Sequence, residues 1–185
     1  MKKNGFTLIE LVVVIVILGI LAVVAAPKFM NLQNDARDAS LKGLKGAIES
    51  TLDVTYAKLS TLGLENAAMV KMVGEPDPSS GLVISDKLSA LGCKGDGTCV
   101  FEYGYPSDYA PTLATLVSGI SANENAPNDD FVAVMHSGGL AITFKNNTET
   151  KNERVFLKQP ERCYIQYTLP SGGNNHRPQL TIIKC

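Results

Sequence analysis

The sequence predicts an α+β protein in which one long N-terminal helix packs on an antiparallel β-sheet head. Two observations support this fold class. The first is residues 6–26, a run of 21 residues in which only Thr7 and Glu10 have polar side chains. The second is a series of short, strand-like runs after residue 99, separated by turn residues. A chain of 185 residues has room for one apolar segment and one domain of ordinary size.

Residues 6–26 are expected to form the first half of the helix. At about 1.5 Å per residue they span about 32 Å, enough to cross the roughly 30 Å apolar core of a bilayer. Lys2 and Lys3 precede this segment, as the positive-inside rule expects. Glu10 lies inside it, where a carboxylate is costly unless it is protonated, paired or able to reach the interface. Any function assigned to the segment has to explain Glu10.

Beyond Pro27 the helix continues with a different pattern, in which apolar residues recur at helical spacing. They are Leu41, Leu44, Ile48, Leu52 and Leu59. We therefore expect one helix from about residue 6 to about residue 60, with a single apolar stripe in its second half. Gly19 and Pro27 are its helix-weakening positions, because glycine lowers helix stability by about 1 kcal/mol and proline removes a backbone hydrogen bond. Gly43 and Gly46 are interpreted as close-packing points.

Residues 61–185 are expected to form a globular head. Residues 61–99 give no clear assignment beyond a loop at 75–81 and a short helix at 85–91. Strand-like runs follow at residues 100–105, 131–136, 140–144, 162–169 and 179–184. The second and third of these runs predict a hairpin, and the last two predict another hairpin with a long loop.

Four cysteines, Cys93, Cys99, Cys163 and Cys185, all follow the apolar segment. An even number of cysteines beyond an export-type N-terminus predicts two disulfides, and the spacing does not fit a zinc site. Four cysteines allow three connectivities. If residues 169 and 179 pair, Cys163 lies directly opposite Cys185, Ile165 stacks on Ile183 and Tyr167 on Thr181. We therefore predict the bridges Cys163–Cys185 and Cys93–Cys99.

No catalytic residue, metal site or cofactor is expected, so the chain is not predicted to be an enzyme. Neither of the glycine-rich phosphate-binding motifs occurs in the sequence. His136 lies beside Ser137 but without a nucleophile elbow, and Asp96 lacks the ligand spacing of a calcium loop. A net charge of −1 gives no electrostatic basis for binding nucleic acid.

Three interpretations of the N-terminus compete. A cleaved secretory signal has a shorter apolar centre than residues 6–26. A plain signal anchor fits the length but leaves Glu10 unexplained. In the third interpretation, cleavage between Gly5 and Phe6 on the cytoplasmic side leaves the whole apolar helix in the mature protein.

The segment Gly5-Phe6-Thr7-Leu8-Ile9-Glu10, followed by the Val/Ile run, Gly19 and Pro27, resembles the N-terminus of type IV pilins, which carry class III signal peptides. The short leader and the continuation Ala25-Ala26-Pro27-Lys28-Phe29 are most similar to the major pilins of mannose-sensitive haemagglutinin pili. The resemblance covers roughly the first 40 residues. It implies the pilin fold.

The resemblance also implies a role for each matched residue. Gly5 would be the last leader residue before the cleavage site of a prepilin peptidase, and Phe6 would become an N-methylphenylalanine at the mature N-terminus. Glu10 would act in assembly, because an ammonium at Phe6 and the carboxylate of a neighbouring subunit reduce each other's cost of burial. The simpler alternative is that Glu10 reaches the cytoplasmic interface. In similar pilins the helix between Gly19 and Pro27 loosens when subunits enter the filament.

The function implied is that of a structural subunit of a type IV pilus, used for attachment and biofilm formation. Its parts would be a leader (1–5), a transmembrane and filament-core helix (6–26), an amphipathic helix (27–60) and the head (61–185). Its partners would be further copies of the chain, a prepilin peptidase and methyltransferase, an assembly platform and an outer-membrane secretin. Surface glycans and abiotic surfaces are candidate targets.

The subunit would lie in the bacterial inner membrane with its head in the periplasm, and later in an extracellular pilus. Two alternatives remain. A pseudopilin of a type II secretion system would share the N-terminus, although the major pseudopilins rely on calcium rather than on cystines. A signal-anchored periplasmic binding module would use the helix only as a tether.

Overall fold

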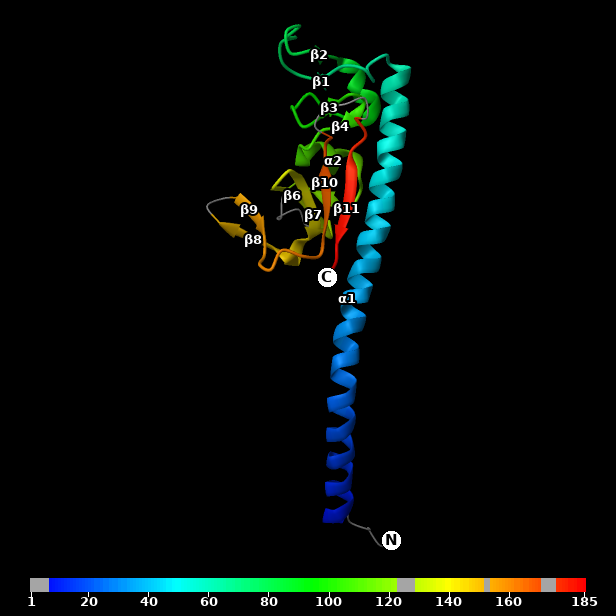
Figure 1. Cartoon of the computed structure of the whole chain (residues 1–185), viewed down its shortest axis with the longest axis vertical. Coiled ribbons are helices and arrows are strands. Elements are labelled where there is room, and N and C mark those ends of the chain that lie inside the picture. Colours follow the sequence, from blue (N-terminus) through cyan, green and yellow to red (C-terminus); the bar gives the residue numbers. More distant parts are fainter. Residues whose placement is uncertain (1–6, 123–128, 152–153, 171–175) are drawn as a thin grey trace, which may run out of the picture.

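The computed structural model of the chain is a long helix with a head of short strands beside its C-terminal half (Figure 1). The structure describes residues 7–122, 129–151, 154–170 and 176–185, without the side chains of residues 30 and 31. The helix α1 (Leu8–Thr61) has 54 residues and is therefore about 81 Å long. The predicted α+β class, with a long N-terminal helix and a β-sheet head, is confirmed.

The second half of α1 packs on the head through the apolar stripe that the sequence predicts. Its members Leu41, Leu44, Ile48, Leu52 and Leu59 are all buried. Neither Gly19 nor Pro27 interrupts α1, which is continuous from Leu8 to Thr61. The helix thus supports the head along one side and extends well beyond it.

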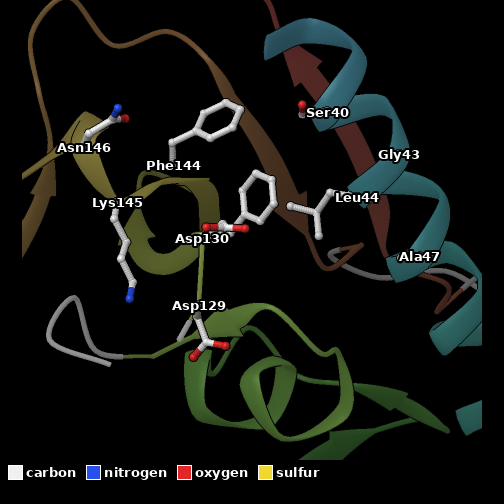
Figure 2. Close-up of a pocket in the computed structure, with 10 residues that line it drawn as sticks. Ser40, Gly43, Leu44, Ala47, Asp129, Asp130, Phe144, Lys145 and Asn146 are labelled. Atoms are coloured by element: carbon white, nitrogen blue, oxygen red, sulfur yellow. The ribbon is translucent and has the colours of Figure 1, made fainter. Parts of the chain in front are cut away.

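Gly43 and Gly46 are not close-packing points within this chain, so that interpretation is wrong. A Cβ added at either glycine would have no neighbouring atom within 4 Å. Gly43 borders an open hollow of about 690 Å³ between α1 and the head, opposite Asp130 and Phe144 (Figure 2). Both glycines are exposed on α1, so within the described chain neither brings another backbone into close contact.

The main sheet has five strands in the order β11-β10-β7-β6-β5. They are β5 (Ile120–Ser121), β6 (Phe131–His136), β7 (Gly139–Phe144), β10 (Tyr164–Thr168) and β11 (Gln179–Ile183). Only the β5–β6 pair is parallel among these described strands. Side chains from β6, β7 and β10, including Ile142 and Ile165, form one buried cluster with α1 and with α2 (Ala110–Leu116). The principal core therefore lies between α1 and this sheet.

A smaller sheet covers the C-terminal end of α1, in the order β2-β1-β3-β4. Its strands are β1 (Met69–Lys71), β2 (Leu82–Ile84), β3 (Val100–Glu102) and β4 (Tyr105–Pro106). The predicted short helix is the 3₁₀ helix η1 (Asp86–Leu91), which Ser85 caps by accepting a hydrogen bond from the backbone of Lys87. A second buried cluster joins Leu59 of α1 to Val70, Phe101 and the Cys93–Cys99 bridge.

A third, two-stranded sheet projects from the side of the head away from α1 (Figure 1). It consists of β8 (Thr148–Lys151) and β9 (Arg154–Leu157), which follow the 3₁₀ helix η2 (Lys145–Asn147). We did not predict this hairpin, nor β1, β2, β5 and α2. These elements have two to seven residues each, too few to establish a hydrophobic period.

The single strand predicted at residues 100–105 is wrong. The chain reverses between β3 and β4, with Tyr103 and Gly104 both in the left-handed region at φ values of 47° and 83°. A Cβ at Gly104 would lie 2.7 Å from the ring of Tyr56, so only glycine fits this close approach. The two strands are thus the arms of a tight hairpin.

The register predicted for the second hairpin is wrong by one residue. Ile165 pairs with Ile182 and Tyr167 with Leu180, whereas the prediction stacked Ile165 on Ile183 and Tyr167 on Thr181. The backbone N–H of Cys163 accordingly donates to the carbonyl of Lys184 at 3.2 Å rather than lying opposite Cys185. Cys163 has a left-handed φ of 60°, which takes its side chain out of the strand alternation and toward Cys185. Both predicted disulfides, Cys93–Cys99 and Cys163–Cys185, are present.

Candidate assembly site on the N-terminal helix

The first half of α1 stands clear of the head (Figure 1). Its large apolar side chains from Leu8 to Val24 are between 42% and 80% exposed. This part of α1 is long and apolar enough to cross a membrane. A continuous apolar surface of this length needs lipid or other apolar helices around it.

Glu10 and Thr7 form a capping box at the start of α1. Glu10 Oε2 accepts hydrogen bonds from the backbone N–H of Thr7 at 2.8 Å and from the Thr7 hydroxyl at 2.7 Å. The Thr7 hydroxyl accepts a longer hydrogen bond, 3.4 Å, from the backbone N–H of Glu10. The pair satisfies donors that the first turn leaves unpaired, and it places a negative charge at the positive end of the helix dipole.

We did not predict this cap from the sequence, although its signal is present. Thr-x-x-Glu before an apolar run is the spacing of a capping box, and Thr7-Leu8-Ile9-Glu10 has it. The cap supplies hydrogen bonds but no positive charge. Among the described residues, no basic side chain forms an ion pair with Glu10. Within residues 7–122 and the other described segments, the carboxylate is therefore held by local hydrogen bonds and by the helix dipole, without an ion-pair partner.

The other residues predicted for the N-terminal site are the two processing positions and the two helix-weakening positions. Gly5 and Phe6, the predicted processing positions, lie outside the described residues, as do Lys2 and Lys3. Gly19 lies in the exposed apolar part of α1, and Pro27 follows it on the same unbroken helix. Their predicted role in weakening the helix stays a prediction, because one conformation of the helix does not show how easily it opens.

The predicted disulfides lie at opposite ends of the head. Cys93 and Cys99 are buried beneath the smaller sheet, and their bridge joins two residues six positions apart in the sequence. The Cys163–Cys185 bridge fixes the C-terminus to the start of β10. The backbone N–H of Cys185 also donates to Asp38 Oδ1 at 2.9 Å, so the C-terminus is attached to α1 as well. Within the described parts of the chain, no cluster of His, Cys, Asp or Glu could hold a metal ion.

Residues 1–26 match the prokaryotic N-terminal methylation motif. This motif indicates a type IV pilin-like or pseudopilin precursor. The motif implies a substrate of a prepilin peptidase that assembles into a pilus-like filament, which is a structural role. The long apolar helix fits an inner-membrane-anchored precursor that later joins a surface filament. Comparison of the chain with curated proteins and with solved structures finds no match.

Proposed function

We propose that the chain is the structural subunit of a type IV pilus. It would be made as a prepilin, cleaved after Gly5, N-methylated at Phe6 and polymerised through α1. The observation that supports this proposal is the exposed apolar half of α1 with a single carboxylate, Glu10, in its first turn. Residues 1–5 would be the leader, 6–26 the membrane and filament-core helix, 27–60 the amphipathic helix and 61–185 the outer head.

The chemistry of cleavage supports an ion pair between subunits. Cutting after Gly5 creates an ammonium at Phe6, next to the cap residue Thr7. Inside a bundle of apolar helices, an unpaired ammonium or carboxylate costs several kcal/mol, whereas losing a helix cap costs about 1 kcal/mol. Glu10 therefore gains more by turning from Thr7 to the Phe6 ammonium of a neighbouring subunit than by keeping its cap. The pair would also fix the axial position of one helix against the next.

The resemblance to the major pilins of mannose-sensitive haemagglutinin pili narrows the proposed role to attachment and biofilm formation. The partners would be copies of the chain, the peptidase and methyltransferase, an assembly platform and an outer-membrane secretin, with surface glycans or abiotic surfaces as targets. Loosening of α1 between Gly19 and Pro27 would accompany entry into the filament. The two disulfides of the head favour a pilin over a major pseudopilin, since similar pseudopilins rely on calcium instead.

Glu10→Ala tests the proposed ion pair. We expect cleavage after Gly5 to continue, because the change lies beyond the cut, and filaments to disappear. Mass spectrometry of the N-terminus measures cleavage and methylation, and the yield of sheared surface filaments measures assembly. Abundant filaments from Glu10→Ala would contradict the proposal.

Two control variants separate assembly from local helix capping. Thr7→Val removes the capping hydroxyl but keeps the carboxylate, so its filaments should persist. Glu49→Ala removes a half-exposed carboxylate elsewhere on α1, one that pairs with Lys45 at 3.6 Å, and should also leave assembly intact. Equal loss of filaments in Glu10→Ala and Thr7→Val would assign the effect to the cap. An unmethylated chain that still begins at Met1 would indicate a plain signal anchor, and absence of the chain from purified pili would favour a pseudopilin.

A further inference from the structure

Four segments from three regions of the sequence meet in a pocket near the C-terminal end of α1. They are the last turns of α1, the segment that follows it, the β3–β4 turn and the residues just before β11. The pocket has a volume of about 310 Å³. Its lining combines tyrosine rings with a carboxylate, an amide, an imidazole and a guanidinium, a composition that core packing alone does not require.

Two stacked ring pairs form the walls of this pocket. The Tyr103 ring stacks on His176 with ring centroids 3.7 Å apart, and the Tyr56 ring stacks on Tyr105 at 4.9 Å. Tyr103 has a left-handed backbone with φ of 47°, which costs a residue with a Cβ roughly 1 kcal/mol or more. Its backbone N–H donates to the carbonyl of Ala67 at 2.9 Å, which holds it in place. Such strain is typical of sites where a side chain has to be presented in one position.

The carboxylate of Glu65 supplies the charge of the pocket. Its Oε1 accepts a hydrogen bond from the Asn66 amide at 2.9 Å, but its Oε2 is buried and has no hydrogen-bond partner among the described residues. The one guanidinium in the lining, that of Arg177, pairs with Asp53 on α1. Asp53 therefore balances the charge of Arg177, and among the described lining residues the carboxylate of Glu65 has no ion-pair partner.

We propose that this pocket binds an organic primary ammonium group, such as the side chain of a lysine. The ammonium would donate a hydrogen bond to Glu65 Oε2 and neutralise its charge, and the tyrosine rings would attract the cation through their negative faces. A neutral hydroxyl could supply the hydrogen bond but would leave the charge uncompensated. The proposal concerns the head alone and does not depend on pilus assembly.

A titration of the full-length chain tests this proposal. The protein, with ¹³C-labelled tyrosine rings, is kept in a polyoxyethylene detergent, which carries neither an ammonium nor a sugar. The probe is Nα-acetyl-lysine amide, followed by NMR of the rings. We expect saturable shifts at Tyr56, Tyr103 and Tyr105, while Tyr164 and Tyr167, outside the pocket, report only on folding.

Variants and analogues of the probe identify which interaction matters. Glu65→Gln keeps the shape of the side chain and should weaken binding at least tenfold, whereas Glu75→Gln, in an exposed loop, should not change it. Nα-acetyl-norleucine amide, which has a similar stem without the ammonium, should bind at least tenfold more weakly. Tyr103→Asn suits the left-handed backbone and should fold well, yet it should bind several-fold more weakly because one ring is lost.

Three outcomes would overturn the proposal. One is an unchanged affinity in both Glu65→Gln and Tyr103→Asn. Another is equal binding of the lysine and norleucine amides, which would show that the charge has no role. The last is tighter binding of methyl glucoside than of the lysine amide with the same sensitivity to Glu65→Gln, which would assign the pocket to a neutral sugar.

Discussion

Replacing Cys163 and Cys185 together by alanine should destabilise the head more than replacing Cys93 and Cys99. The first bridge closes a sequence separation of 22 residues and the second a separation of 6. In the chain-entropy model, the stabilisation grows with the logarithm of the closed loop. It amounts to about 3.4 kcal/mol for the longer loop and about 2.2 kcal/mol for the shorter one. The expected difference between the two double variants is therefore about 1 kcal/mol.

The surroundings of the longer loop add to this difference. Without the bridge, Cys185 is held by its backbone hydrogen bond to Asp38 and by the pairing of β11 with β10. Since β11 is an edge strand of the main sheet, it can detach without breaking the pairs among β10, β7 and β6. Loss of the bridge should therefore appear first as faster amide exchange in β11, before the head unfolds as a whole.

The assay is urea unfolding of the full-length chain in nonionic detergent. Tyrosine near-ultraviolet circular dichroism suits it, because the chain has no tryptophan and α1 dominates the far-ultraviolet signal. Chemical reduction of the native chain serves as a control that removes both bridges. The reasoning is refuted if the Cys163/Cys185 variant is as stable as the Cys93/Cys99 variant. It is also refuted if, in the Cys163/Cys185 variant, the backbone amides of β11 exchange no faster than those of β6.

Two further predictions concern single side chains. The hydrogen bond and charge of Arg177 lower the pKa of Asp53 below its usual 3.8. The Asp53–Arg177 pair therefore stabilises the folded state fully at pH values above 3.8, and this stabilisation is lost as the pH falls through the folded-state pKa of Asp53. The native chain should therefore unfold at a higher urea concentration than Asp53→Asn at pH 7, and this difference should shrink as the pH is lowered below 3.8. A difference that does not change with pH would contradict the prediction. Gly139→Ala places a Cβ 2.1 Å from the carbonyl oxygen of Tyr167 and should lower the free energy of unfolding by about 3 kcal/mol. Gly138→Ala, whose Cβ has no atom within 4 Å, should lower it by about 1 kcal/mol. Thermal melts compare the two, and equal melting temperatures would show that the backbone of β10 moves aside.

The long helix could be predicted because its evidence is repeated many times along the sequence. Each of Leu41, Ile48 and Leu52 supports the same helical face, so one misleading residue would not have changed the prediction. The cap at Thr7 was also readable, since its four-residue spacing is local. Sequence signals that are repeated or local can be interpreted without knowledge of the tertiary structure.

The register of the second hairpin was predicted one residue out, because the prediction placed the two bridged cysteines directly opposite each other. Cys163 has a left-handed backbone, so its side chain reaches Cys185 although the strands pair one position away from that alignment. The neighbouring sequence carries no signal of this conformation. The pocket around Glu65 was hidden for another reason. Tyr56, Tyr103 and His176 are separated by dozens of residues, and only the tertiary fold brings them together.

Fourteen large apolar side chains lie exposed on α1 between Leu8 and Val24. Moving them from an apolar medium into water at roughly 1.5 kcal/mol each costs on the order of 20 kcal/mol. Since about 1.4 kcal/mol is a factor of ten, a dissolved subunit would be rarer than a membrane-held one by about fourteen powers of ten. No aqueous pool of subunits can therefore feed a growing assembly. In the proposed filament, each subunit would pass directly from lipid to the helices that receive it, and the growth rate would depend on that transfer rather than on a subunit concentration in solution.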